Sequence, residues 1–520
     1  MVNNFLKNNL AILFGNVFFK IGGYIYKFLM VYLLNNYAYG ILTIISPFQN
    51  ILQTLAAGGL PPTISKYVSE YNATNQKENS YKLILVSIKI AILLGITFGL
   101  LMIFFIAPLL VKIYNNKSLL LPLQIIGLIV PFSAIVGVFR GIFQGTYEMT
   151  HILTSRAIEQ ITMILSAIVL IILGFSVVGA IFGSVIGFFS SLISVIIILH
   201  KYFLDVFQGM LKLKMDFKEE IKIAYKIISF SIPVILTAIS EIGIYSMTTT
   251  IMPLFITISE VGYFGIAEPI ARLPLMISNS LATTILPVTS EMFASKNTNI
   301  LKKYMFNALR YNLIIMVPIC LFIMIFSKEV LLVMFFTKPF YSKGANVLTI
   351  LTLGMFFYSI FAITSSMIQG AGKPKSSMYL LIGGFIQILL LSFIFIPYFG
   401  VNGGAISTTL TTATMTLISL IYLNKHISLK FNIGHYLKIL FAGIIITIFL
   451  LILPKNLIGF YIGLLFLFPI YLITLMIIKG FTTDDLNILM KIENKIPFKL
   501  TIIKKMIIKG TEVNFNEYRK

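Results

Sequence analysis

The chain has 520 residues, of which 58% are hydrophobic and only 11% are charged, and its mean hydropathy is +0.96. A soluble protein of this length carries about 25% charged residues, so too little polar surface is available here to cover water-facing domains. This balance excludes soluble enzymes, coiled coils and disordered scaffolds. It predicts an all-α polytopic membrane protein.

Long apolar runs give the predicted spans, because a helix needs roughly 20 apolar residues to cross a hydrocarbon core about 30 Å thick. Fourteen such runs lie along the chain: 9–33, 41–60, 83–106, 119–145, 150–174, 177–200, 223–251, 260–294, 304–327, 345–369, 376–396, 402–423, 437–453 and 457–478. The runs do not alternate apolar and polar residues as barrel strands do. We therefore expect about 14 transmembrane helices, the first of them retained, since no A-x-A-like cleavage site follows it.

The net charge of +22 comes from 40 Lys and Arg against 18 Asp and Glu. With the N-terminus inside, the outer loops hold only a few basic residues, namely Lys112, Lys117, Lys328, Lys338, Lys343 and Lys455. The remaining loop charges lie inside, which places both termini in the cytoplasm and explains the excess without nucleic acid. Cys320 is the one cysteine and there are four His, so we expect neither a disulfide nor a metal site. The same loops are too short for an external catalytic domain, and no GxxxxGK[ST] string is present.

Three short sequence matches indicate an internal repeat. The matching segments are 140–150 with 365–375, 177–185 with 402–410, and 60–65 with 286–291. The spacing is 225 residues for the first two pairs, which puts Gly179 over Gly404, and 226 for the third. Six predicted spans make up each half, and an even number of crossings returns the chain to the same side. The halves should therefore be parallel six-helix lobes, as in alternating-access transporters.

The predicted organisation follows from this repeat. It has an N-lobe at 1–200, a cytoplasmic amphipathic linker at 201–222, a C-lobe at 223–424, two additional helices at 425–478 and a basic cytoplasmic tail at 479–520. The linker and tail should lie on the anionic inner leaflet. We expect a monomer in the cell membrane, in contact with membrane lipids.

Charged side chains at membrane depth cost at least a few kcal/mol and usually face a wet cavity. Lys20 and Lys27 lie two turns apart on the first predicted helix, and Arg272 lies at a similar depth in the eighth. Glu268 is one turn from Arg272, and Glu241 lies in the outer half of the seventh helix. We expect these five residues to bind substrate. The alternatives are that the lysines snorkel along a lipid-facing helix and that Glu268 only neutralises Arg272.

A second group of residues lies at helix ends and bends, and here gating or interlobe contacts are expected. Its members are Arg140, Gln144, Arg156, Glu159, Pro269 and Pro274. The two prolines lie in the predicted helix 260–294, which is too long to be straight, and a similar break is expected after Pro233. Ordinary membrane-helix packing is the alternative for these bends.

The R-G-x-F-Q-G string at 140–145 and the G-L-P-P-x-I-S-K string at 59–66, with fourteen spans in two parallel halves, resemble a known family. They are similar to the polysaccharide-transporter and stage V sporulation protein B-like branch of the multidrug/oligosaccharidyl-lipid/polysaccharide (MOP) exporter superfamily. The resemblance implies V-shaped lobes and export of lipid-linked glycans. In the lipid II flippases of this family, cations on helices 1 and 8 face the cavity, and helices 13 and 14 form a groove for the lipid tail.

Lys20 and Lys27 match the helix 1 cations and Arg272 matches the helix 8 cation, although those flippases favour Arg on helix 1. The expected function is an alternating-access flippase for a polyprenyl phosphate- or pyrophosphate-linked oligosaccharide or cell-envelope polysaccharide precursor. We expect no cofactor, with Na⁺ or H⁺ as a possible coupling cation. One alternative is a cation-coupled multidrug extruder, which Glu241 and Glu268 would serve. A membrane-embedded glycan polymerase or glycosyltransferase is the second, and the short loops argue against it.

Overall fold

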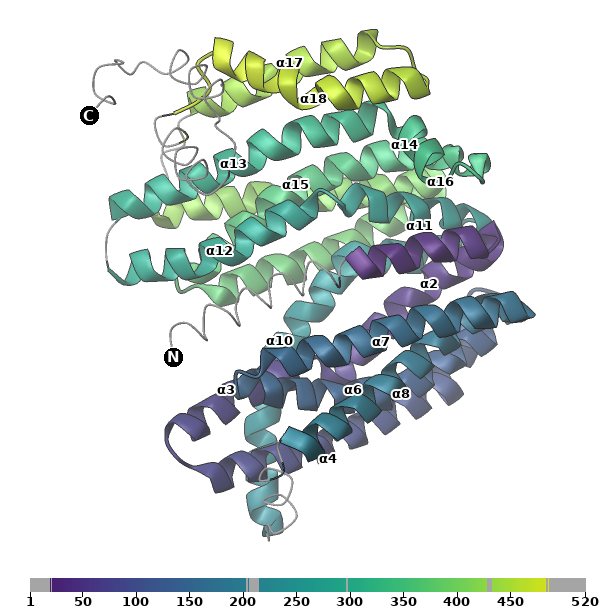
Figure 1. Ribbon diagram of the computed structural model, residues 1–520, viewed down its shortest axis with the longest axis vertical. Coiled ribbons are helices and arrows are strands. Elements are labelled where there is room, and N and C mark those ends of the chain that lie inside the picture. The colour runs from purple at the N-terminus through teal and green to yellow at the C-terminus, as the bar shows by residue number, and fades with distance from the viewer. Residues whose placement is uncertain are drawn as a thin grey trace. The chain divides into compact units, whose positions relative to one another are not determined.

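The structure is a computed structural model that describes residues 19, 21–202, 204, 215–295, 298–427, 433–482 and 485. Regular structure in these segments is helical, without strands (Figure 1). After the first helix, Ile21–Leu33, the longer helices are α2 Asn36–Gln53, α3 Leu60–Ala73, α4 Lys77–Leu101, α5 Ala107–Ile113, α6 Leu120–Gly145, α7 Met149–Leu170, α8 Ser176–Tyr202, α10 Phe217–Ile251, α11 Ile258–Arg272, α12 Leu275–Ala294, α13 Thr298–Ile325, α14 Ser327–Met334, α15 Ala345–Gly370, α16 Pro374–Ile427, α17 Ile433–Ile452 and α18 Leu457–Ile477.

Among the described residues, nine helical stretches are long and apolar enough to cross a membrane. Two of them, Met149–Tyr202 with 54 residues and Pro374–His426 with 53, are about twice the length that one crossing needs. Each contains a residue with positive φ near its middle, Ser176 in the first and Gly400 in the second, where the chain folds back. The chain is thus a multi-pass membrane protein. The count of fourteen and the two six-helix lobes stay predictions.

The two fold-back points have nearly the same backbone conformation. Ser176 has φ 47° and ψ −130°, and Gly400 has φ 56° and ψ −131°. Three residues later, a Cβ atom on Gly179 would meet Leu170, and one on Gly403 would meet the backbone of Phe395, so each glycine allows close return of the chain. The two fold-back points are therefore 224 residues apart, one fewer than the spacing of the sequence match. The predicted pairing of Gly179 with Gly404 stays a prediction.

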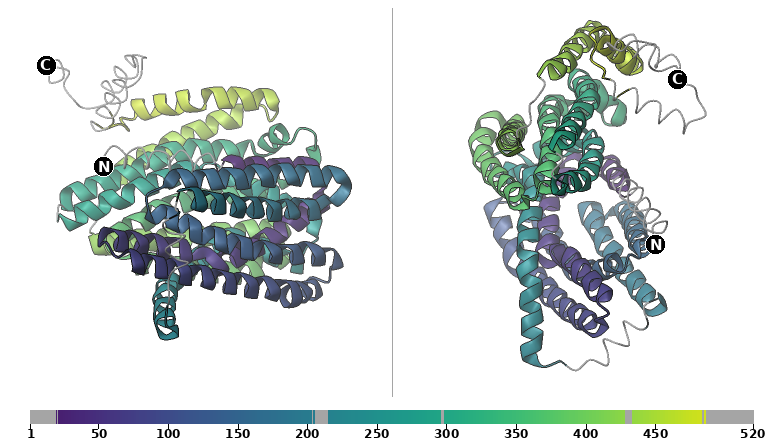
Figure 2. Two further views of the ribbon diagram at one scale, coloured as in Figure 1. Left: turned by 60° about the horizontal axis from the view of Figure 1, so that its bottom comes forward. Right: turned by 90° about the vertical axis from the view of Figure 1, so that its left-hand side faces the viewer.

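One compact unit comprises the described residues up to Pro269 together with Leu381–Thr408. In this unit α6 packs against α3, α4 and α8, and α7 packs along α8. Helix α10 packs against α2, α3 and α4, and it crosses α4 steeply in both Figure 1 and Figure 2. Polar caps fix the local ends, as where Asn35 accepts a hydrogen bond from the Ala38 amide at 2.8 Å before α2.

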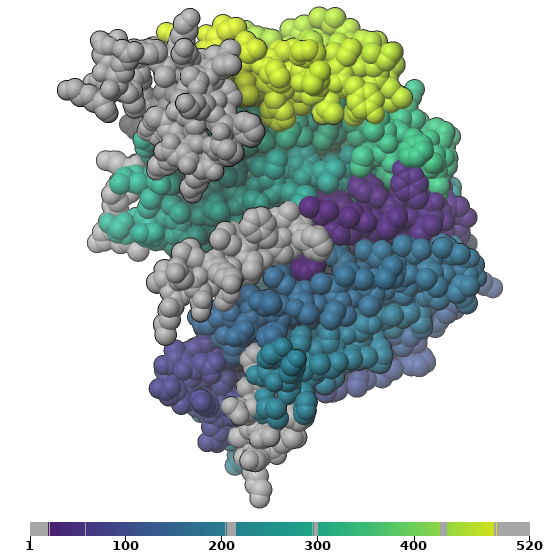
Figure 3. All heavy atoms as spheres, viewed as in Figure 1, coloured from purple at the N-terminus to yellow at the C-terminus, as the bar shows by residue number. Residues whose placement is uncertain are grey.

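The second compact unit comprises Ile270–Leu380 and the described residues from Thr409 onward. Here α15 packs against α12 and α13, and α17 packs against α13 and α18. The α17–α18 pair, yellow in Figure 3, exposes large apolar side chains such as Phe441, Ile444 and Leu465. Such a surface is suited to lipid. The two compact units are defined by contacts between residues, and their bounds differ from those of the two halves of the sequence repeat. The predicted lobe boundaries remain predictions.

The predicted helix 260–294 is interrupted between Arg272, where α11 ends, and Leu275, where α12 begins. Pro274 precedes α12 and has no amide hydrogen, so the regular bonding of a continuous helix is lost there. The break expected after Pro233 is not formed, because α10 runs as one helix of 35 residues through that proline.

Candidate functional site

Lys27 is half-buried on the first helix, whose neighbouring residues contact α7 and α8. The Tyr26 hydroxyl donates a hydrogen bond to the Ala180 carbonyl at 3.2 Å. The Gln160 amide donates to the Phe19 carbonyl at 3.2 Å. These bonds hold one side of the helix against the hairpin, with Lys27 one residue farther round. Lys20, predicted at the same site, lies outside the described residues.

Helix α11 carries Glu268, and it is held closely against α2 in the first unit. The Asn36 amide donates to the Ser259 carbonyl and the buried Tyr39 hydroxyl donates to the Gly265 carbonyl, each at 3.0 Å. A Cβ atom on Gly265 would lie 2.7 Å from Cγ2 of Thr43, so only glycine permits this approach. These contacts fix α11, the helix that carries Glu268, against α2.

The predicted acidic residues differ in burial. Glu268 is only 8% exposed, whereas Glu241 on α10 is exposed. Both belong to the first unit, with Lys27, while the half-buried Arg272 belongs to the second. The predicted pairing of Glu268 with Arg272 stays a prediction.

Arg140 forms an ion pair that joins three helices of the first unit. Its Nη2 atom lies 2.6 Å from Oε2 of Glu159 on α7. Its Nε atom donates to the Ser155 hydroxyl at 3.1 Å, and Nη2 also donates to the Ser191 hydroxyl on α8 at 3.1 Å. The structure therefore brings these two predicted residues together inside one unit. Substitution of either partner would leave a charge without compensation.

The remaining residues of the predicted gating group are placed differently. Gln144 and Arg156 are exposed, while Pro269 and Pro274 are buried at the break in the predicted eighth helix. Their predicted roles in gating stay predictions. Within the described segments, no group of three or more His, Cys, Asp or Glu side chains could hold a metal ion.

Arg310, which the sequence analysis missed, is the largest fully buried side chain that the structure describes. From α13 its guanidinium donates to both carboxylate oxygens of Asp485, at 2.8 and 2.5 Å. It also donates to the Gly480 carbonyl at 2.8 Å and to the Thr482 hydroxyl at 3.1 Å. This bidentate geometry fastens the segment after α18 to α13. A lone arginine next to an apolar run was the only sequence signal.

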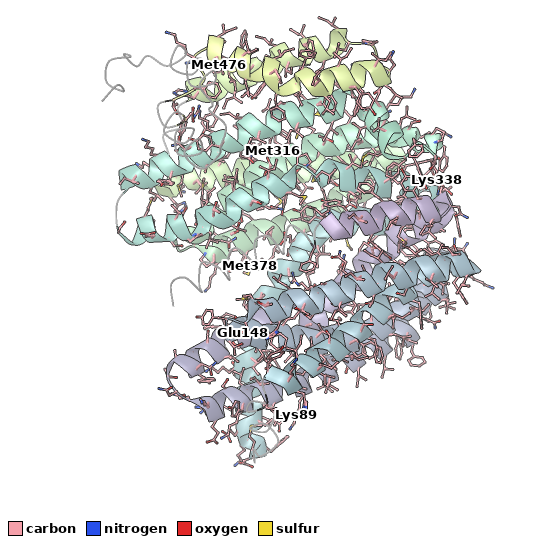
Figure 4. All side chains as sticks on the ribbon, in the orientation of Figure 1. Lys89, Glu148, Met316, Lys338, Met378 and Met476 are labelled. Carbon is pink, nitrogen blue, oxygen red and sulfur yellow. The ribbon has the colours of Figure 1, made fainter. Side chains whose placement is uncertain are left out.

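The first unit also has a group of lysine contacts where α4 meets the beginning of α10. Lys82 lies 2.9 Å from Glu78 and 2.8 Å from Glu219, and Lys89, labelled in Figure 4, lies 2.9 Å from Glu220. Both glutamates of α10 lie in its first turn, where negative charge is favourable. Side chains far apart in sequence thus fasten α10 to α4.

A mainly apolar cavity of about 360 Å³ lies in the second unit between α13, α15 and α17. Its lining includes Val317, Cys320, Leu353, Phe356, Leu440 and Ile444. The resemblance implied a lipid-tail groove on the last two helices, and α17 does contribute to this cavity. The other walls come from α13 and α15, which that expectation did not include.

Lys455 lies in the short connection between α17 and α18. Its ammonium donates to the Leu450 carbonyl at 3.1 Å and lies 4.5 Å from the centroid of the Phe326 ring. Burial lowers the pKa of Lys455, and the nearby Glu329 partly offsets this effect. A cation at this position satisfies a carbonyl at the end of α17, where positive charge is favourable.

Comparison with known proteins places this fold. A family model described as "Polysaccharide biosynthesis protein" matches residues 5–293, and a MatE model matches residues 233–394. An uncharacterised membrane protein of Methanocaldococcus jannaschii, MJ1375, is 26% identical over 444 residues, covering 81% of this chain and 99% of the relative.

Two further relatives have functional names. Stage V sporulation protein B of Bacillus subtilis is 24% identical, covering 88% of this chain and 90% of the relative. The probable low-salt glycan biosynthesis flippase Agl15 of Haloferax volcanii is also 24% identical, over 45% of this chain and 51% of the relative.

Solved structures give the same assignment of the fold. The lipid II flippase MurJ, in an inward closed conformation, has a TM-score of 0.68 at 18% identity and covers 89% of this chain and 98% of its own. An inward-facing multidrug resistance MATE transporter also has a TM-score of 0.68, at 17% identity, covering 79% and 94%. The family model spans more than half of the sequence, so the chain belongs to the polysaccharide biosynthesis protein family, the polysaccharide flippase branch of the MOP superfamily.

Proposed function

We propose that this flippase moves a polyprenyl phosphate- or pyrophosphate-linked oligosaccharide, or a related cell-envelope polysaccharide precursor, from the inner to the outer leaflet. Fourteen helices in two parallel six-helix lobes would provide alternating access, with both termini in the cytoplasm. The relatives named as flippases support the transport class.

The observation that carries the proposed substrate class is the presence of cations within apolar helices. Lys27 is half-buried on the first helix, and Arg272 is half-buried at the end of α11. Lys20 belongs to the same predicted set. A glycan head cannot cross hydrocarbon unaided, because each unsatisfied polar group costs several kcal/mol. Ammonium and guanidinium groups are suited to receive its phosphates while the lipid tail remains in the membrane.

The direction of transport has a plausible electrical driving force. Outward movement of negative charge across an inside-negative membrane is favoured by about 2.3 kcal/mol per charge per 100 mV. A diphosphate-linked substrate would therefore gain from the membrane potential even without a coupled ion. A Na⁺ or H⁺ gradient would drive transport in addition to the membrane potential. Glu241 or Glu268 would then bind the Na⁺ ion or the proton.

The second candidate function is cation-coupled extrusion of cationic drugs. The match of the MatE model and the buried carboxylate of Glu268 favour it. The two proposals differ in the charge of the substrate, so binding distinguishes them. The lysines of the first helix favour the anionic substrate.

Native mass spectrometry of the purified full chain would test the proposal with undecaprenyl pyrophosphate-linked disaccharide and with ethidium as the cationic probe. The K20Q/K27Q/R272Q variant should lose the anionic lipid. A matched variant, K112Q/K117Q, removes exposed lysines and should retain it. Ethidium binding that survives K20Q/K27Q/R272Q and is lost in E241Q or E268Q would instead establish the extruder.

A further inference from the structure

A second cluster of cations lies in the first unit, where α3 packs against α10. It consists of Lys66, Tyr67 and Tyr71 on α3 with Lys226 and Phe230 on α10. We propose that Lys66 and Lys226 form a docking site for a phosphate-bearing headgroup at this end of the helices. The inference rests on the proposed function for its biological role, since such a site would receive an anionic lipid before transport.

The two ammonium groups lie over the same aromatic ring. Lys226 Nζ is 4.1 Å from the centroid of Tyr67, and Lys66 Nζ is 4.7 Å from that centroid. Lys66 Nζ is also 4.5 Å from the centroid of Phe230. Tyr67 is buried, and its ring meets Phe230 edge-on with centroids 6.0 Å apart. Two packed rings therefore fix the positions of both positive charges.

These two lysines differ from the other lysines of the same region in their partners. Lys82 and Lys89 are each in contact with a carboxylate, whereas within the described residues neither Lys66 nor Lys226 has a carboxylate at ion-pair distance. Lys226 donates to the Tyr71 hydroxyl at 2.9 Å, and Glu70 acts on it only from farther away. An aromatic face attracts a cation without consuming its N–H donors.

Both ammonium groups lie against the Tyr67 ring, so two positive charges are concentrated near one aromatic side chain. Each ring contact contributes about 0.5–1 kcal/mol at exposed sites. A phosphate or diphosphate would accept charge-assisted hydrogen bonds from these ammonium groups. Lys66 is exposed and Lys226 half-buried, so the site is open to an entering headgroup.

The position of the cluster agrees with such a role. Lys66 follows the predicted second span, and Lys226 lies three residues into the predicted seventh span, so both lie at the inner membrane interface in the predicted topology. Basic residues at that interface attract anionic headgroups, at about 1 kcal/mol per Lys or Arg. The site thus faces the leaflet from which the proposed substrate would enter.

Native mass spectrometry of the purified full chain tests the site with undecaprenyl pyrophosphate and with dioleoyl phosphatidylglycerol, while inorganic pyrophosphate serves as a competitor. The K66Q/K226Q variant should bind the lipid phosphate at least about tenfold more weakly than wild type, because two charge-assisted hydrogen bonds are lost. The K66R/K226R variant should restore binding, since arginine keeps both the charge and the stacking.

The matched control is K218Q/K222Q, which removes two exposed lysines from the beginning of the same helix. If lipid binding weakens equally in K66Q/K226Q and K218Q/K222Q, the attraction is spread over the surface and the proposed site is wrong. Unchanged lipid binding in K66Q/K226Q would also overturn the site. Displacement by inorganic pyrophosphate would identify the diphosphate alone as sufficient, and a lack of displacement would show that the site requires the lipid-borne group. If K66Q/K226Q fails to fold, the single K66Q variant, altered at an exposed side chain, replaces it.

The binding measurement does not depend on transport. Headgroup binding that needs Lys66 and Lys226 in a protein without flippase activity would uphold the site and overturn the proposed function. If wild type flips the substrate and K66Q/K226Q binds the lipid as wild type does, the proposed function stands and the site is overturned.

Discussion

Removal of the charge from Asp485 should unlock the segment after α18 from α13. In D485N the buried guanidinium of Arg310 keeps the Gly480 carbonyl and the Thr482 hydroxyl but loses its counter-charge. Loss of one partner from a buried ion pair costs about 3–5 kcal/mol. Asp485 also accepts the Thr482 amide at 2.7 Å, so the turn that carries it should loosen as well.

The single cysteine supplies the assay. Cys320 is 3% exposed and lies on α13, the helix that carries Arg310. Cys320 also lines the apolar cavity between α13, α15 and α17. A thiol-reactive dye should therefore label it slowly in the folded state and faster when α13 is released, because burial of the thiol slows its reaction. If labelling follows the opening equilibrium, the loss of 3–5 kcal/mol should raise its rate by about 100-fold or more.

The controls separate the ion pair from general effects. D484N, which changes the adjacent aspartate, should label at the wild-type rate. R310M/D485L replaces the pair with apolar side chains and should recover most of the protection. Labelling of D485N at the wild-type rate would refute the reasoning that this pair holds the end of the chain.

The remaining predictions concern the first unit. E159Q leaves the half-buried Arg140 without its counter-charge and should lower the unfolding free energy by about 1–3 kcal/mol. A lower aggregation temperature in detergent would show this, whereas E148Q, at an exposed glutamate, should leave that temperature unchanged. G265A places a Cβ against Thr43 and should destabilise the α2–α11 contact by about 1–3 kcal/mol, whereas G383A, with no neighbouring atoms within 4 Å, should be neutral. If G265A and G383A have the same aggregation temperature, the close approach of Gly265 to Thr43 is contradicted. If E159Q and E148Q have the same aggregation temperature, the stabilising role of the Arg140–Glu159 ion pair is contradicted.

The helices could be predicted from sequence because hydrocarbon thickness sets a minimum length for each apolar run. The family could be recognised because the chain contains short strings such as R-G-x-F-Q-G at 140–145. The break at Pro274 was also predictable, since proline cannot donate the bond that a continuous helix needs. The register of the repeat is harder to predict, because glycines lie at both 403 and 404 and either could be matched with Gly179.

Side-chain partnerships could not be predicted in the same way. Arg310 and Asp485 are 175 residues apart, and no periodicity links them. The contacts of Lys66 with Phe230 and of Lys226 with Tyr67 depend on the packing of α10 against α3, which the apolar pattern does not determine. Arg140 and Glu159 were both singled out, but the sequence suggested a contact between lobes where the structure shows an ion pair within one unit.

Transport of an anionic lipid-linked glycan is the central claim, and reconstitution tests it most directly. Proteoliposomes holding the full chain would be loaded with undecaprenyl pyrophosphate-linked disaccharide, and its appearance in the opposite leaflet would be read with a membrane-impermeant lectin. We predict flipping by wild type that accelerates when the source side is made electrically negative, little flipping by K20Q/K27Q/R272Q, and normal flipping by K112Q/K117Q. Flipping that is undiminished in K20Q/K27Q/R272Q would contradict the account.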